Sequence, residues 1–458
     1  MKQKALTLLL LLVTAGAGFA QTRGDAALRQ VIDQDGANFG ARTTNPTLPA
    51  AEHLRRAEIY SANRLFPQAR AHWQKILDNY PNDAGMPKTL FGIARSYMWE
   101  REYEKAVTWF DRLTKDHLDT KDGREGLAFK GASYVRLGRP LEAATTYEQY
   151  TTLFPNGERI ESSYLNIIDA YREAGRYDDA NARIEKTRQK FAGKPSAVNA
   201  LHARVRMEIF RSNWKDAVAA ADDLLRAGGF AGSMASADET KYLKGLALEK
   251  LGRKADADAV YASIPFSFSS YYSGLAAEKL STAGKVRNTG SVSPRLAGDY
   301  PVMYRTELLR HAKAHKIDPR FLLAIMKQES SFRANAKSPA GARGLLQLVF
   351  DTAIKYKDDA GYPNLQPDDL YDPGINVAIG STYVKELKDE FGGLYEAIAA
   401  SYNGGEDNAA RWLNRSKPRD AGVFAAEVGF AETKNYVFKV MNNYRVYREL
   451  YTEQLNRK

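Results

Sequence analysis

The sequence predicts a mainly α-helical protein, in which an N-terminal α-solenoid of paired helices precedes a second, mostly helical domain. Three observations lead to this prediction. A pattern of small and large residues recurs every 37 residues through the first half of the chain, as it does in stacked structural repeats. The pattern stops after Pro265, and a stretch rich in Gly, Ser and Pro lies between Gly284 and Tyr300. Beyond Pro301, apolar residues recur at helical spacing behind capping residues.

The N-terminus has the three parts of a secretory signal peptide. Lys2 and Lys4 precede an apolar run that ends at Val13, and small residues follow as far as Ala20. We predict that residues 1–20 are a signal peptide and that the mature protein is exported. An uncleaved anchor is the alternative, although the apolar run is short for a bilayer span. No later stretch is long and apolar enough to cross a membrane, so no stable membrane anchor is expected after cleavage.

Composition narrows the classes of partner. The chain has no cysteine, which excludes both a disulfide framework and a lipid-modified N-terminal cysteine. Its formal net charge of +11 suits an acidic polymer or a membrane surface, and equally suits plain solubility. Zinc-finger spacing, phosphate loops and RNA-binding signatures are absent from the sequence, so nucleic acid is not an expected partner.

Residues 51–265 follow an N-terminal extension over 21–50 and carry the repeat. Each unit combines a compact residue, an alanine twelve residues later and, in the first four units, a large side chain four residues after that alanine. Successive positions are Ala57, Ala94, Gly131, Ile168 and Val205; Ala69, Ala106, Ala143, Ala180 and Ala217; and Trp73, Phe110, Tyr147 and Ile184. Small residues beside large ones let two helices cross closely and the next pair stack on them. The pattern resembles the tetratricopeptide repeat, which implies either a surface for a protein partner or a scaffold that only gives shape.

Residues 266–300 connect the two parts. The serine-led stretch from Phe266 to Leu280 predicts a capping helix, and the remainder as far as Tyr300 predicts a linker. Residues 301–458 then form the second domain.

Glu329 is the candidate for chemistry in this domain. Asp318 and Pro319 are typical of a helix start, and Leu322, Ile325 and Met326 share a face with Glu329. A carboxyl group in apolar surroundings is harder to ionise, so its pKa rises and it can act as a general acid near neutral pH. A buried structural glutamate, or one exposed at a frayed helix end, is the alternative.

Polar residues follow two apolar elements near this helix. The loop from Ala334 to Gly344 is dominated by small residues, which let a backbone come close to a ligand. Gln347 then offers an amide that can donate and accept, as sugar hydroxyl and acetamido groups require. A second apolar stretch ends at Tyr402 and Asn403, just before a Gly-Gly stop.

Four ordered segments resemble the soluble lytic transglycosylases of bacterial cell-wall turnover over about Val302 to Tyr447. They are QESSF at 328–332, SPAGARGLLQL at 338–348, the Tyr402-Asn403 pair and EVGFAETKNYV at 427–437. A further segment, LYDPGINVAIG at 370–380, lies between them. The resemblance implies a lysozyme-like, mostly helical catalytic domain in the periplasm, acting on peptidoglycan glycan strands without metal or cofactor.

The same resemblance implies roles for single residues. Glu329 becomes the only catalytic acid and base, which protonates the bond between N-acetylmuramic acid and N-acetylglucosamine and then accepts the proton of the muramoyl C6 hydroxyl. The expected substrate contacts are Ser338, Gln347, Tyr402, Asn403 and Glu427, of which Glu427 positions either the substrate or the tyrosine. Ser330 is placed with them but is expected chiefly to support the helix end. The product implied is a 1,6-anhydro sugar.

Several positions depart from the family pattern. Leu346 replaces a common methionine, and Val349 with Phe350 stands where methionine and proline are usual, a change that affects the expected shape of the cleft. The remaining departures are Ser401, Gly404, Gly429 and Lys434.

Two alternative functions stay open at this stage. One is a muramidase that hydrolyses the same bond on the same fold, and the other is a catalytically inactive, wall-binding scaffold. A metal site is not expected: His311 and His315 lack a third ligand nearby, and the acidic residues at 358–359 and 368–369 lack calcium-loop spacing.

Overall fold

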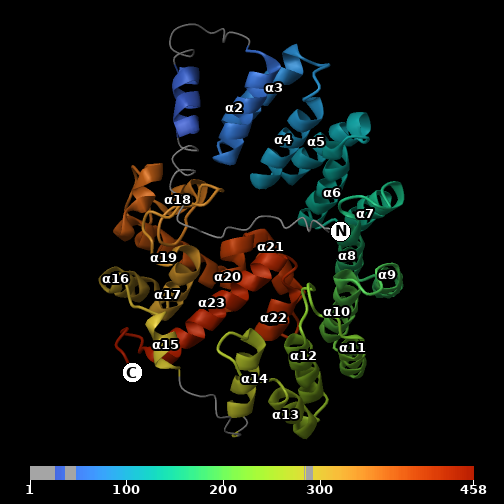
Figure 1. Ribbon diagram of the computed structural model, residues 1–458, viewed down its shortest axis with the longest axis vertical. Helices are drawn as coiled ribbons and strands as arrows, with labels where there is room; N and C mark the ends of the chain where they lie inside the picture. The colour runs from blue at the N-terminus through green and yellow to red at the C-terminus, as the bar shows by residue number, and fades with distance from the viewer. Residues whose placement is uncertain (1–25, 37–47, 283, 285–291) are drawn as a thin grey trace, which may run out of the picture.

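The computed structural model describes residues 26–36, 48–282, 284 and 292–458. Within these residues the chain is helical, and its β-structure is limited to isolated bridges. The predicted fold class is confirmed: Figure 1 shows an arc of paired helices beside a C-terminal group of helices. None of the described helices has the length and apolar character of a membrane span. The predicted signal peptide, 1–20, lies outside the described residues.

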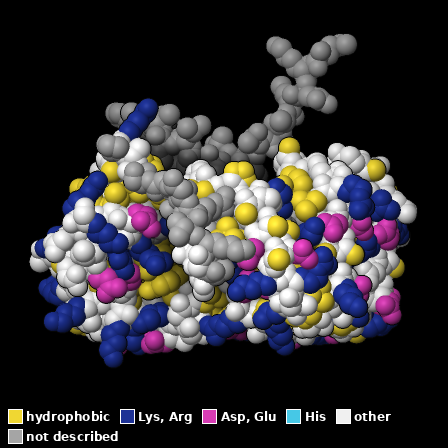
Figure 2. All heavy atoms as spheres, turned by 90° about the horizontal axis from the view of Figure 1, so that it is seen from below, with side chains coloured by type: hydrophobic (Ala, Val, Ile, Leu, Met, Phe, Trp, Pro, Cys, Tyr) yellow, Lys and Arg dark blue, Asp and Glu magenta, His cyan; other side chains and the backbone are white. Residues whose placement is uncertain are grey.

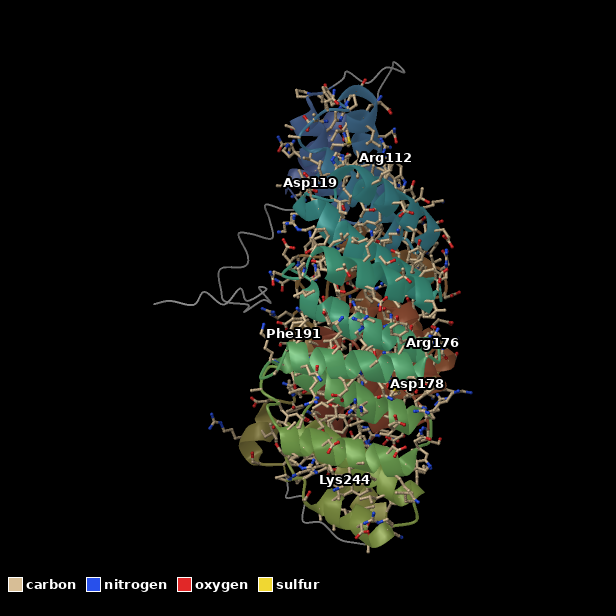
Figure 3. The ribbon with its side chains drawn as sticks, turned by 90° about the vertical axis from the view of Figure 1, so that its right-hand side faces the viewer. Arg112, Asp119, Arg176, Asp178, Phe191 and Lys244 are labelled. Atoms are coloured by element: carbon tan, nitrogen blue, oxygen red, sulfur yellow. The ribbon has the colours of Figure 1, made fainter. Side chains whose placement is uncertain are left out.

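The solenoid consists of six helix pairs in the described part of the chain. Their bounds are α2 Ala50–Ala62 and α3 Phe66–Asn79; α4 Met86–Trp99 and α5 Tyr103–His117; α6 Lys121–Arg136 and α7 Pro140–Leu153; α8 Ile160–Glu173 and α9 Tyr177–Lys190; α10 Pro195–Phe210 and α11 Trp214–Ala227; α12 Ala237–Lys250 and α13 Lys254–Ala262. Figure 3 shows these helices stacked in layers along the long axis of the molecule.

The repeated small residues lie where the two helices of a pair cross. A Cβ atom on Gly131 would come within 2.8 Å of the Tyr147 ring, so glycine here lets the aromatic side chain lie against the helix without shifting. Ala57 and Ala94 occupy the same place in their pairs and are fully buried. The predicted close crossing of small and large residues is therefore confirmed.

Two segments outside the repeat are also helical. Residues 26–36, in the predicted N-terminal extension, form a helix that packs on the first pair: Val31 is fully buried, and Tyr60 donates a hydrogen bond of 2.6 Å to Asp35. Helix α14, Tyr271–Thr282, lies between the last pair and the C-terminal domain, where Tyr271 stacks on Phe438 with 5.0 Å between ring centroids.

The end of the predicted linker is structured instead. Residues Pro294–Gly298 form a short helix, α15, because Ser293 caps its free N–H groups and Pro294 has the backbone angle of a first helical residue. Ala297 and Tyr300 are buried in the core of the C-terminal domain. The linker prediction is wrong for this stretch, and the core of the domain begins before Pro301.

The C-terminal domain packs around one large core. Its remaining elements are α16 Arg305–His315, α17 Pro319–Ser330, α18 Phe350–Tyr356, the short 3-10 helix Pro367–Tyr371, α19 Pro373–Glu390, α20 Tyr395–Gly404, α21 Glu406–Asn414, α22 Ala421–Glu427 and α23 Ala431–Leu450. Helix α17 lies along α23, and α20 contacts α21 and α23. The core thus brings together the helices that carry the predicted site residues.

The solenoid contacts the C-terminal domain from its first pair to its last. Arg64, after α2, forms an ion pair of 2.7 Å with Asp351 of α18. At the other end, Glu239 of α12 accepts a hydrogen bond of 2.7 Å from Lys434 of α23. In Figure 1 the solenoid accordingly curves around the C-terminal helices. On the face drawn in Figure 2, Lys and Arg side chains are spread over the surface with fewer acidic ones among them.

Candidate active site

Helix α17 delivers Glu329 to the edge of the core. Asp318 caps the helix by accepting from the backbone N–H of Arg320 at 2.9 Å, as its sequence predicts. Leu322, Ile325 and Met326 are fully buried. The last turn carries Glu329, and the helix ends at Ser330 because Ser331 adopts a left-handed conformation with φ 48°.

The Glu329 carboxyl group is electrostatically isolated. Part of the residue stays accessible to solvent, but the carboxyl lies among buried atoms, and this burial raises its pKa to about 7. Tyr436 of α23 donates a hydrogen bond of 2.6 Å to Oε1 and opposes the rise. Among the described residues Glu329 has no ion-pair partner. A carboxyl with this pKa can give up a proton and later take one at neutral pH.

The loop after α17 is fixed by buried amide contacts. Asn376, which is fully buried on α19, accepts from the N–H of Leu346 at 2.8 Å and donates to the carbonyl of Arg343 at 3.0 Å. Gly344 has φ 79°, and a Cβ there would come within 2.1 Å of the Leu370 carbonyl oxygen. Only glycine fits this position, so the loop is held at one distance from α19.

Gln347 and Ser338 take part in this loop. Gln347 donates from Nε2 to the carbonyls of Ala336, at 3.0 Å, and Gly344, at 2.9 Å, so its amide oxygen is the atom left for a ligand. The Ser338 hydroxyl accepts from the Ala342 N–H at 3.1 Å and remains partly exposed. The structure therefore gives Ser338 a turn contact and leaves Gln347 able to accept a hydrogen bond.

Tyr402 joins this loop to Glu329. Its hydroxyl donates to the Leu346 carbonyl at 2.7 Å, and its ring packs on Tyr383 with 5.3 Å between centroids. Burial, and next the charge of Glu329, raise the pKa of Tyr402 well above its usual value. The neighbouring Asn403 is exposed and accepts from the Thr433 hydroxyl at 2.7 Å. The structure thus assembles Glu329, the Gln347 loop, Tyr402 and Asn403.

Glu427 lies elsewhere. Its side chain is 1% exposed. Arg172 donates to Oε1 at 2.6 Å, Arg206 donates to Oε2 at 2.7 Å, and Arg415 approaches Oε2 at 3.3 Å. Two of these arginines belong to the solenoid, so Glu427 is part of a buried ion cluster between the two domains. The prediction that Glu427 contacts substrate is wrong, because its oxygens are already occupied.

Ser330 is a second correction. It is 1% exposed, and its hydroxyl donates to the Met326 carbonyl at 3.2 Å within the helix. It supports the end of α17, which is the role that the sequence chiefly predicted for it, and is not a surface for substrate.

Sequence reasoning missed two contributors. Tyr436, which holds Glu329, lies within the EVGFAETKNYV segment, and Asn376, which holds the loop, lies within LYDPGINVAIG. Both residues carry a polar group within an otherwise apolar helical face, and this is the feature of the sequence that could have marked them as contributors to the site. Their partners are far away in the sequence, so the signal could not name them.

The matches to known families agree with this geometry. Residues 308–424 match the model of the transglycosylase SLT domain, and residues 53–83 match a tetratricopeptide repeat. The chain carries an SLT domain. This SLT domain follows a tetratricopeptide-like solenoid, as the motifs predicted.

Several lytic murein transglycosylases are similar to this chain over parts of its sequence. The chain is 32% identical over 163 residues to the soluble lytic murein transglycosylase of Escherichia coli K12, and 35% identical over 126 residues to the putative soluble lytic murein transglycosylase of Haemophilus influenzae. These matches cover 35% and 27% of this chain, and 25% and 21% of those relatives. The chain therefore spans about a quarter of the length of the curated relatives it matches.

A solved structure shares the whole architecture. The X-ray structure of an inactive mutant of lytic transglycosylase Slt from Pseudomonas aeruginosa matches 93% of this chain and 85% of that chain, with a TM-score of 0.50 and 17% identity. This likeness shows that the solenoid and the SLT domain have the fold of that protein.

The two histidines of α16 do not change this assignment. His315 lies 3.4 Å from the hydroxyl of Thr382 through Nε2, and His311 contacts Arg310. Across the described ranges, the structure contains no group of three His, Asp or Glu side chains arranged around a metal position.

Proposed function

We propose that this protein is an exported peptidoglycan lytic transglycosylase of the periplasm. It cleaves the β-1,4 bond between N-acetylmuramic acid and N-acetylglucosamine without water, leaves 1,6-anhydro-muramoyl ends, and serves cell-wall turnover or remodelling. The observation that carries the proposal is the carboxyl group of Glu329, which lies in the last turn of α17 in an SLT domain and has a pKa of about 7. The names of its relatives, soluble lytic murein transglycosylases, support the substrate class.

The reaction needs two proton transfers, and both pass through one carboxyl group. Protonated Glu329 donates its proton to the glycosidic oxygen, and the bond from that oxygen to C1 breaks. The Glu329 carboxylate then removes the proton of the C6 hydroxyl as that oxygen bonds to C1. Glu329 ends protonated, so atoms and charge balance without water. A pKa near 7 suits both the donating and the accepting step.

The position of Glu427 favours this route over hydrolysis. A hydrolase of the usual type has a second carboxylate across the scissile bond, either to activate water or to act as nucleophile. Glu427 was the second carboxylate that the motifs offered, and the structure commits it to Arg172, Arg206 and Arg415. We therefore assign both proton transfers to Glu329.

The surrounding groups orient the sugar. The free amide oxygen of Gln347 and the exposed amide of Asn403 bind the acetamido and hydroxyl groups of the sugar, which can donate and accept hydrogen bonds. Tyr402, whose pKa is raised in part by the charge of Glu329, supports the positive charge that develops at C1.

Product analysis tests the function. We expect mass spectrometry of digested sacculi to show anhydro-muramoyl ends, 18 Da lighter than reducing ends, a difference that follows from the missing water. Reducing ends alone would replace the proposal with a hydrolytic muramidase. Intact sacculi together with tight sacculus binding would replace it with an inactive wall-binding scaffold.

The hydrogen bond from Tyr436 predicts a shift in pH dependence. Because Tyr436 stabilises the charged form of Glu329, we expect Tyr436→Phe to raise the pKa of Glu329. The fall in kcat/KM on the alkaline side, near pH 7 in the wild type, should then move to higher pH, since the acid stays protonated longer.

Tyr444→Phe is the matched control for this shift. Tyr444 lies on the same helix, and its hydroxyl donates to Asp318 at 2.8 Å rather than to Glu329. The control should leave the alkaline limb in place. If Tyr436→Phe lowers the rate at every pH without moving the limb, Tyr436 has only a structural role.

A further inference from the structure

Trp99 is an exposed aromatic residue that the proposed mechanism does not use. It ends α4 and is 53% exposed, the largest exposed fraction among the large hydrophobic side chains of the described residues. The guanidinium carbons of Arg64 and Arg95 lie 5.1 Å and 5.9 Å from the centre of its ring. An exposed indole flanked by cations combines an apolar face with positive charge.

Arg95 has no acidic partner in the described part of the chain. Its guanidinium lies 4.9 Å from the Phe129 ring and 5.7 Å from the Phe91 ring, with Trp99 on a third side. Burial and then the charge of Arg159 lower the pKa of Arg95, and Glu125, which pairs with Arg159, opposes this only in part. A guanidinium held by aromatic rings is well prepared to bind an anion from outside.

The repeat places this group on the face that points to the SLT domain. Arg95 is equivalent to Asp169 and Arg206, since the three positions are separated by whole repeats of 37 residues. Asp169 pairs with Arg415 at 3.3 Å, and Arg206 pairs with Glu427. The inner face of the solenoid therefore meets the SLT domain in the later repeats and presents Arg95 and Trp99 in the second repeat.

Two contacts bring Trp99 close to the candidate active site. Arg64, which flanks Trp99, pairs with Asp351 at the start of α18, four residues after Gln347. Arg101, two residues after Trp99, pairs with Glu406 at the start of α21, three residues after Asn403. The solenoid is thus fastened to the ends of both segments that flank Glu329, and Trp99 lies between the fastening points.

We propose that Trp99 and Arg95 form a subsite through which the solenoid binds the peptidoglycan strand beyond the cleaved bond. The indole stacks on a pyranose ring, and the guanidinium binds a carboxylate of a stem peptide. This inference rests on the proposed function, because the strand must run from Glu329 to Trp99. Charge complementarity selects the occupant: a glycan that carries carboxylates fits an unneutralised arginine beside an exposed aromatic face.

Binding measured without cleavage tests the subsite. In a Glu329→Gln background, we expect Trp99→Ala to weaken the binding of intact sacculi by about tenfold, the value of one stacking contact. Arg95→Met should weaken binding to the same sacculi, and this effect should vanish with glycan strands stripped of stem peptides. The Trp99→Ala effect should persist with the stripped strands.

Trp109→Ala is the matched control. Trp109 pairs with Arg112 at 5.5 Å, on α5, and Figure 3 shows Arg112 on the outer side of the solenoid. This variant should bind sacculi like its parent. Unchanged binding in Trp99→Ala would overturn the subsite.

Activity with Glu329 intact separates the subsite from the proposed function. Trp99→Ala should cleave a short muropeptide dimer at the normal rate, because that substrate does not reach the solenoid. Loss of activity on the dimer would also overturn the subsite, since it would show general damage. If the Glu329→Gln protein still cleaves sacculi, the proposed function itself fails, whatever the Trp99 variants do.

Discussion

Glu329→Gln is expected to lower the release of anhydro-muropeptides from sacculi by about a thousandfold. The substitution keeps the shape and the hydrogen-bonding capacity of the side chain but removes the transferable proton, and general acid and base catalysis contributes effects of this size. Both proton transfers are assigned to this one group, so its loss removes both steps. The rate of release, followed by chromatography of soluble products, measures the loss.

The stability of the same variant provides the control. Burial raises the pKa of Glu329 from 4.5 to about 7 in the folded protein, so the stability that this group contributes is complete below pH 4.5, where it is protonated in both states, and is lost as the pH rises through 7. Gln carries no charge, and Glu329→Gln should be at least as stable as the wild type at pH 8. A variant that is both less stable at pH 8 and inactive would not support a catalytic role. Undiminished activity would exclude Glu329 as the acid.

Much of the solenoid could be predicted because its determinants are local and repeated. The contact of Gly131 with Tyr147 spans sixteen residues within one helix pair, and the same spacing recurs in the other units. The units therefore support one another, and an ambiguous assignment in one unit is settled by the pattern of the others. The helix that carries Glu329 was predictable for a similar reason, since its cap and its apolar face lie within twelve residues.

The rest of the site depends on contacts between distant residues. Tyr436 reaches Glu329 across 107 positions of sequence, and Arg172 reaches Glu427 across 255. Periodicity and capping carry no information about such pairs. The motif therefore singled out Glu427 correctly, but it predicted substrate as the partner of this residue, whereas the partners are arginines, two of them from the solenoid.

Two of the departures from the family pattern lie beside the solenoid. Val349 and Phe350 begin α18, immediately before Asp351, which pairs with Arg64 of the solenoid. Lys434, in place of arginine, is 2% exposed and pairs with Glu239 of α12. These two sites of change therefore lie at the contact between the solenoid and the SLT domain.

The buried cluster around Glu427 predicts the second large effect. Glu427→Gln would leave Arg172, Arg206 and Arg415 in a dry interface with one negative charge fewer. Breaking a buried ion pair from one side costs about 3 to 5 kcal/mol, because the remaining charge loses its compensation. We expect a loss of this size in the free energy of unfolding, measured by denaturant titration at pH 7, together with a lower Tm.

The pH dependence and a matched variant distinguish this role from substrate binding. Burial alone would raise the pKa of Glu427, but the arginines lower it to about 2, so its contribution is complete above pH 4.5 and is lost as the pH falls toward 2. The difference in stability between wild type and Glu427→Gln should shrink over that range. Glu432→Gln, an exposed change in the same segment, should leave stability unchanged. If Glu427→Gln instead raised KM and left stability unaltered, Glu427 would have a role in substrate binding. Adding Arg206→Met to Glu427→Gln should restore part of the lost free energy of unfolding. The second change removes a buried cation whose charge Glu427 no longer compensates.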